Sequence, residues 1–226
     1  CVDVVDWDND GARDLLLGSI DAKVRLYLNA GTDAAPDFQS AVDLQDDGAT
    51  MYVYGTRSSP EVADLDLDGR KDLLVGNTNG QLMLYSNVGT DAAPAFSGYS
   101  YVTSGGVAID LASSRSRPTV VDWTGNGLLD VLLGSSDGTV RLYRAAPLMG
   151  DANLDGLVSD ADYTIWADHY EADDATWQMG DFNDDGTVTD ADYTLWADHY
   201  SGAGAGVPEP ATLGLLAVGL LLRRRR

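Results

Sequence analysis

The sequence predicts a mainly β protein of partial β-propeller blades, followed by a small α-helical module of the EF-hand type and an apolar C-terminal tail. Three observations lead to this prediction. A 58-residue repeat carries short strand-like runs, a 30-residue repeat carries loops followed by helical patterns, and the chain ends in apolar residues and arginines. Hydrophobic residues make up 44% of the chain, which is enough to form a core.

The chain is acidic, with 36 Asp and Glu residues against 14 Lys and Arg and a net charge of −22. Because such a chain repels phosphate backbones, we expect no nucleic-acid partner. The Asp residues recur at regular spacing among Leu, Val, Trp and Tyr, which indicates ligand positions rather than a disordered acidic tail. Cys1 is the only cysteine, which excludes a disulfide framework and a thiolate metal site.

The long repeat makes Asp6, Asp64 and Asp122 equivalent, within DWDNDGARDLLLG, DLDLDGRKDLLVG and DWTGNGLLDVLLG. A second strand-like run follows each of them, and both runs are bounded by turn residues. Several short strands at a fixed long period favour propeller blades. The same register places Cys1 opposite Ser59. We therefore expect residues 1–146 to hold about 2.5 blades of a longer propeller, with more blades upstream.

The first two long repeats contain the pattern D-x-D-x-D-G-x-x-D, in which alternate carboxylates can turn toward one point. Gly11 and Gly69 permit the reversal of the chain. Two carboxylates ~4 Å apart repel by ~1 kcal/mol in water and by ~4 kcal/mol at an effective dielectric near 20. Clustered oxygens of this kind suit Ca²⁺, and the alternative is a pair of acidic β-turns. The predicted ligands are Asp6, Asp8, Asp10 and Asp14, then Asp64, Asp66, Asp68 and Asp72.

The third long repeat keeps two carboxylates and two neutral oxygens at the matching positions, so its metal site stays open. Its candidate ligands are Asp122, Thr124, Asn126 and Asp130.

The short repeat has the ligand spacing of an EF-hand loop, with Asp in place of the final Glu. The predicted ligands are Asp151, Asn153, Asp155, Leu157 (through its carbonyl), Ser159 and Asp162, then Asp181, Asn183, Asp185, Thr187, Thr189 and Asp192. A helix should follow each loop, because Ser159 and Thr189 stand three residues before an Asp in a capping-box arrangement. The stripe Tyr163, Trp166, Ala167 and Tyr170, repeated 30 residues later, should form the module's own core.

The long repeats resemble the FG-GAP/VCBS family of integrin-type β-propellers, through the aspartate loop and the L-L-x-G…L-Y-x-N-x-G-T…P-x-F frame. This resemblance implies Ca²⁺ sites and adhesion or ligand binding, although such repeats also accompany enzymes. Residues 150–201, with loop then helix twice, resemble a type I dockerin, which implies two Ca²⁺ ions and a cohesin partner. Loop positions 10 and 11 hold Asp160-Ala161 and Asp190-Ala191, unlike the contact residues common in dockerins, so the cohesin partner stays open.

The composition of residues 202–207 indicates a linker, and residues 207–226 are predicted to be a sorting or anchor segment. The apolar run from Ala211 to Leu222 is 12 residues long, shorter than the ~20 that span a bilayer. Four arginines follow it, which is typical of the cytoplasmic end of a membrane segment. Together with Pro208-Glu209-Pro210 this segment resembles a PEP-CTERM signal. The resemblance implies export in a Gram-negative-type bacterium, transient inner-membrane association and processing by an exosortase; the alternative is a plain membrane anchor.

The sequence carries no nucleophile elbow, no phosphate-binding loop and no unassigned carboxylate pair, so we predict no catalytic residues and no enzyme activity in this segment. The first hypothesis is a secreted, calcium-binding surface or extracellular-matrix protein with a cohesin-like or surface-polysaccharide partner. The alternative is the accessory C-terminal region of a larger extracellular enzyme acting on polysaccharide, with its catalytic domain upstream.

Overall fold

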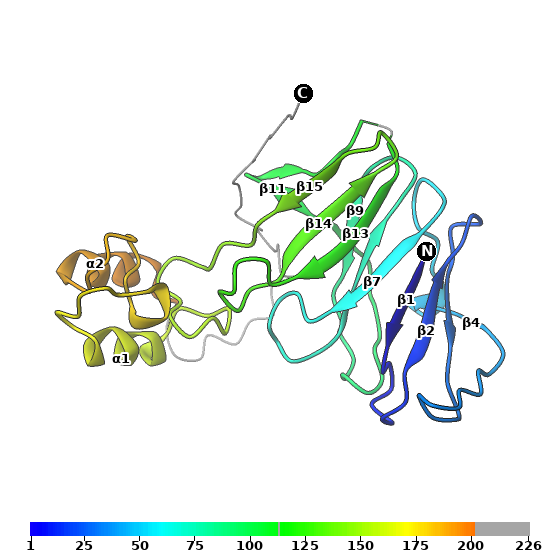
Figure 1. Ribbon diagram of the computed structural model, residues 1–226, viewed down its shortest axis with the longest axis horizontal. Coiled ribbons are helices and arrows are strands. Elements are labelled where there is room, and N and C mark those ends of the chain that lie inside the picture. The colour runs from blue at the N-terminus through cyan, green and yellow to red at the C-terminus, as the bar shows by residue number, and fades with distance from the viewer. Residues whose placement is uncertain (113, 202–226) are drawn as a thin grey trace. The chain divides into compact units, whose positions relative to one another are not determined.

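The computed structural model describes residues 1–112 and 114–201, which form two units (Figure 1). The first is a β unit that contains Cys1–Leu65 and Gly69–Ala145, and the second is a helical unit that begins at Ala146. The predicted linker and sorting segment, residues 202–226, lie outside the described residues.

The β unit contains one antiparallel sheet for each long repeat. The first sheet runs in chain order through β1 (Val2–Val5), β2 (Asp14–Gly18), β3 (Val24–Tyr27) and β4 (Val42–Asp43). The second consists of β7 (Ser59–Ala63), β8 (Asp72–Gly76), β9 (Leu82–Tyr85) and β10 (Ser100–Tyr101). The third consists of β13 (Ser116–Val121), β14 (Asp130–Ser135) and β15 (Val140–Tyr143).

A small hairpin follows each of the first two sheets. These hairpins are β5 (Gln45–Asp46) with β6 (Ala49–Thr50), and β11 (Thr103–Ser104) with β12 (Val107–Ala108). The residue that follows each hairpin, Met51 or Ile109, lies in the core.

The core of the β unit lies between the sheets. One cluster joins the first and second repeats around Leu16, Val24 and Leu73, and another joins the second and third around Leu84 and Leu133. The strands β8 and β9 are buried at every position, because the second sheet is covered on both faces. A mainly β fold is thus confirmed, although the sheets of the described residues form no closed propeller.

The helical unit contains α1 (Asp160–Asp168), a short 3-10 helix (Trp177–Met179) and α2 (Asp190–His199). Both predicted capping boxes are present: the Ser159 and Thr189 side chains accept from the helix backbone, and the carboxylate of the Asp three residues later accepts from the backbone N–H of the cap residue. No helix within residues 1–112 and 114–201 is long and apolar enough to cross a membrane.

The predicted aromatic stripe packs the two halves of the helical unit against each other. The Trp166 indole N–H donates to the Thr189 carbonyl, and Trp196 donates to the Ser159 carbonyl, both at 3.0 Å. Trp166 is 9% exposed, as expected of a core residue. The prediction that the whole stripe forms the core is wrong for its four tyrosines, which remain exposed at the rim of this cluster.

Candidate metal sites

Five loops, three in the β unit's repeats and two in the helical unit, begin with the same turn. In each, the carboxylate of the first Asp accepts a hydrogen bond from the backbone N–H of the glycine five residues later. The bonds are Gly11 to Asp6 (3.0 Å), Gly69 to Asp64 (2.9 Å), Gly127 to Asp122 (2.9 Å), Gly156 to Asp151 (3.0 Å) and Gly186 to Asp181 (2.8 Å). The long and short repeats thus share one turn geometry, although the last Asp of the loop stands farther along the chain in the short repeats than in the long ones.

The backbone of these loops is left-handed at the fourth and sixth residues. The sixth residue is always glycine, which adopts this conformation without strain. The fourth residue is leucine in two loops, Leu67 at φ 62° and Leu154 at φ 60°. A leucine held there costs of order 1 kcal/mol, so the surrounding hydrogen bonds stabilise a loop shape that the chain alone disfavours.

In the long repeats the last Asp of each loop is buried at the start of the central strand. The Asp14 carboxylate accepts from the backbone N–H of Trp7 (2.8 Å) and of Asn29 (2.7 Å). Asp72 and Asp130 make the equivalent pairs of bonds. These bonds hold the loop, the central strand and the segment after the next strand together, and they aim the carboxylate at the loop.

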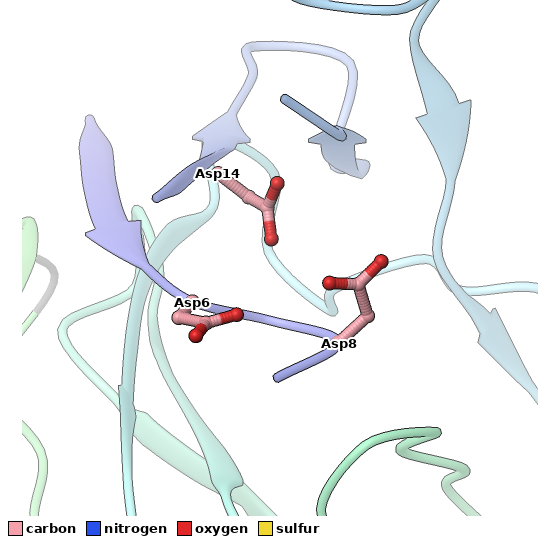
Figure 2. A group of neighbouring side chains, drawn as sticks. All are labelled: Asp6, Asp8 and Asp14. Carbon is pink, nitrogen blue, oxygen red and sulfur yellow. The ribbon is translucent and has the colours of Figure 1, made fainter. Parts of the chain in front are cut away.

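Three carboxylates converge in each of the first two loops. Asp6, Asp8 and Asp14 bring ligand oxygens within 4.8 Å of one another (Figure 2), and Asp64, Asp66 and Asp72 do the same. The predicted fourth ligands, Asp10 and Asp68, are not in these groups. Asp10 instead accepts from the Ala12 N–H at 2.8 Å.

The electrostatics of the first loop favour a cation. Burial raises the pKa of Asp8, and the neighbouring carboxylates of Asp10 and Asp14 raise it further. The Asp8 Oδ1 atom is buried and has no hydrogen-bond partner within the described part of the chain. A buried, unsatisfied carboxylate oxygen is costly. The donor set, hard oxygens in an acidic loop, therefore fits a hard cation such as Ca²⁺.

The third loop has its charge offset by backbone donors instead. Asp122 accepts from three N–H groups, of Gly125, Asn126 and Gly127, at 2.7 to 3.1 Å. These bonds, that of Gly127 first, lower the pKa of Asp122. Thr124 and Asn126 add no carboxylate, so this loop has less charge for a cation to neutralise.

The two loops of the helical unit make equivalent hydrogen bonds to their last Asp. Asp162 Oδ1 accepts from the N–H of Ala152 (2.9 Å) and of Asn153 (3.1 Å), and Asp192 does the same with Phe182 and Asn183. In the structure as described, these loops do not gather three carboxylates as closely as the first two. Asn153 and Asn183 each donate to the Asp at the fifth position of their loop, Asp155 or Asp185.

The helical unit is strongly acidic. Residues 146–201 contain fourteen Asp and Glu residues and neither Lys nor Arg. The first Asp of each loop is buried. Burial raises the pKa of Asp151 to about 6, and the nearby carboxylate of Asp162 contributes to the shift. Without Lys or Arg, the unit offers only His169 and His199 as basic side chains, and this excess of carboxylates fits bound cations as counter-charge.

Two overlapping segments, residues 6–75 and 64–133, match the model of the FG-GAP-like repeat, and together they cover more than half of the chain. The chain belongs to the FG-GAP-like repeat family. The matched segments of these FG-GAP-like repeats contain the three loops of the β unit. No curated protein matches the chain.

The end of this FG-GAP-like repeat protein carries a second match. Residues 206–226 match the PEP-CTERM protein-sorting motif. This motif is a C-terminal sorting signal of exported, cell-surface proteins in Gram-negative bacteria, and it implies processing by an exosortase. The predicted location of the protein is therefore confirmed.

Sequence reasoning missed two sets of residues that the structure brings together. Ser58 and Ser116 join neighbouring repeats, and Glu61 accepts bonds from the next repeat. A signal was available for the serines, since Arg57–Pro60 and Arg115–Pro118 are equivalent in the 58-residue register.

Proposed function

We propose that this exported FG-GAP-like repeat protein is a calcium-binding, non-catalytic surface protein. In this proposal the repeats are propeller-type blades that form a binding platform for surface polysaccharide, and the helical unit is a dockerin-like duplicated module. The observation that carries the proposal is the convergence of Asp6, Asp8 and Asp14, with one buried Asp8 oxygen unpaired among the described residues. A bound Ca²⁺ would neutralise the repulsion among these carboxylates.

Calcium would act here as a structural ion, because each loop joins elements that are distant in the sequence. The Asp14 carboxylate already connects Trp7, within the loop, to Asn29, which follows β3. A cation held by Asp6, Asp8 and Asp14 would add a cross-link at the same place. In the proposal, the carboxylates serve this purpose and no catalytic step is assigned to them.

In the helical unit we favour a stiffening role over recognition of a cohesin. The position-10 aspartates, which would face such a partner, are engaged within the unit. The Tyr170 hydroxyl donates to Asp190 Oδ1 (3.1 Å), and the Tyr200 hydroxyl donates to Asp160 Oδ1 (2.8 Å). These bonds cross between the two halves, so they support a compact duplicated module.

The experiment is a Ca²⁺ titration of the full chain followed by tryptophan fluorescence, because Trp7 lies between Asp6 and Asp8. We expect Asp8→Asn to weaken the response of the first loop by at least ~10-fold, since it removes a carboxylate from a three-carboxylate site. The matched control is Asp37→Asn, an exposed Asp outside the loops, which should titrate like the wild type. Identical titrations for the wild type and Asp8→Asn would contradict the proposed site.

A further inference from the structure

Two short segments of the β unit share the pattern Arg-Ser-x-Pro, at residues 57–60 and 115–118. The two segments are equivalent in the 58-residue register, and each leads into the first strand of its repeat, β7 or β13. Both lie outside the candidate metal loops, so those loops do not account for the pattern.

The serine and the proline of each segment anchor it in the β unit. The Ser58 hydroxyl donates to the Lys23 carbonyl (2.6 Å), and the Ser116 hydroxyl donates to the Gln81 carbonyl (2.7 Å). The proline of each segment is buried, and its ring fixes the backbone φ angle. The backbone that carries the arginines is therefore held in place by the preceding repeat.

The arginines of these segments gather around one hollow of the β unit. Arg57, Arg115 and Arg117 line a cavity of about 90 Å³ whose other lining residues come from the first and second repeats. None of the described Asp or Glu residues lines it. Arg57 and Arg117 are exposed and Arg115 is half-buried, so a ligand can reach them from solvent.

These three arginines form no ion pair within the part of the chain that the structure describes. Other basic side chains of the β unit do pair with Asp, as Arg13 does with Asp33 and Lys71 with Asp91. In a chain with 36 Asp and Glu residues against 14 Lys and Arg, unpaired arginines at one hollow are unexpected. A cluster of like charge that the protein leaves unpaired favours an anionic partner.

The acidic loops do not neutralise the arginines, because loops and arginines lie at opposite ends of the same strands. Arg57 and Arg115 precede β7 and β13, whereas the loops that begin at Asp64 and Asp122 follow these strands. The five residues of β7 separate its two ends by ~16 Å, at ~3.3 Å per residue. This separation exceeds the Debye length of ~8 Å at physiological ionic strength. The acidic loops therefore leave the positive charge at the hollow largely intact.

We propose that this hollow binds the oxyanion groups of an acidic polysaccharide. The planar guanidinium group of arginine donates two parallel hydrogen bonds to a carboxylate or a similar oxyanion. A volume of about 90 Å³, against ~30 Å³ for one water molecule in the liquid, holds one such group while the rest of the ligand stays outside. Because an arginine recurs at the same position of successive repeats, the arrangement suits a chain with recurring charges.

The hollow would be the ligand-binding part of the proposed polysaccharide platform, and to that extent it rests on the proposed function. Its test reads the affinity for a polysaccharide at one fixed Ca²⁺ concentration, whereas the Asp8→Asn titration reads Ca²⁺ binding with no polysaccharide present. A failure of the metal sites and a failure of this hollow are therefore distinguishable.

Binding of the full chain to polygalacturonate oligomers tests the proposal, in a non-ionic detergent that covers the apolar C-terminal run. We expect saturable binding that weakens as NaCl is added, and no binding to neutral dextran of similar length. Replacing Arg115 and Arg117 together with Gln should weaken the affinity at least ~10-fold, because charge-assisted hydrogen bonds are lost. The single variant Arg57→Gln should also weaken it. The matched control is Arg144→Gln, at an exposed arginine outside the lining of the hollow, which should bind like the wild type.

Three results would overturn the proposal. The first is an affinity for polygalacturonate no higher than that for neutral dextran. The second is an equal affinity of the wild type and the Arg115/Arg117 double variant, as expected if bound Ca²⁺ alone held the polysaccharide. The third is binding of the galacturonate monomer as tightly as of the oligomers, which would show that the hollow takes a free small oxyanion.

Discussion

At the scale of single residues, Glu61 connects the second repeat to the third through one oxygen. Its Oε1 atom accepts from the Val120 N–H (3.0 Å) and from the Thr119 hydroxyl (2.8 Å). Burial raises the pKa of Glu61 above its ordinary value of 4.5, and the negative charge of Asp3 adds to the shift. Burial therefore disfavours the charged form of a side chain that the third repeat holds through two hydrogen bonds.

Substitutions at Glu61 should separate its hydrogen bonds from its charge. Glu61→Ala leaves the Val120 N–H without its acceptor, so we expect a loss of about 1–3 kcal/mol in the free energy of unfolding. Glu61→Gln keeps the acceptor oxygen and should lose less at neutral pH. Urea denaturation of both variants at constant Ca²⁺ measures the difference, and equal losses would contradict this account.

Because the pKa of Glu61 is raised, its contribution to the free energy of unfolding depends on pH. The folded state binds the proton more tightly than the unfolded state, so this group's contribution to stability is fully present below pH ~4.5 and is lost as pH rises through the folded pKa. Glu61→Gln should lack this component. The check is the difference in unfolding free energy between wild type and variant, measured from pH 4 to 7.

At the scale of elements, the close contact between repeats depends on Gly18 and Gly76. We predict that Gly76→Ala destabilises the protein by about 1–3 kcal/mol, because the added methyl group would overlap the Ser116 carbonyl oxygen. Gly134→Ala is the matched control, since its methyl group would meet an oxygen at an ordinary 3.7 Å. Thermal unfolding at low protein concentration compares them, and a similar shift in both would show that the contact is not limiting.

Elements with local signals could be predicted from the sequence, and contacts between distant residues could not. The capping boxes at Ser159 and Thr189 depend on a three-residue spacing, so the sequence predicts them correctly. The hydrogen bond from Ser58 to Lys23 spans 35 residues, and no local pattern encodes it. In the first loop the sequence offers four carboxylates, but it could not show that Asp10 would bond to Ala12.

At the scale of the whole molecule, export and processing concern the C-terminal segment. Replacing Pro208-Glu209-Pro210 with alanines should leave the precursor in the inner membrane, because the sorting motif at 206–226 would be broken. Membrane fractionation of cells producing each form is the measurement. Mass spectrometry of the surface protein gives the complementary check, since a mature chain that retains the terminal arginines would indicate a plain anchor.

In the proposed function, Ca²⁺ binding is a property that each unit has by itself, because both are acidic and both contain the same six-residue turn. Isothermal titration calorimetry of the full, chelator-treated chain tests this claim most directly. We predict uptake of about four Ca²⁺ ions, two by the first loops of the β unit and two by the helical unit, with weaker binding at Asp122. No uptake of Ca²⁺ up to millimolar concentrations would contradict the account.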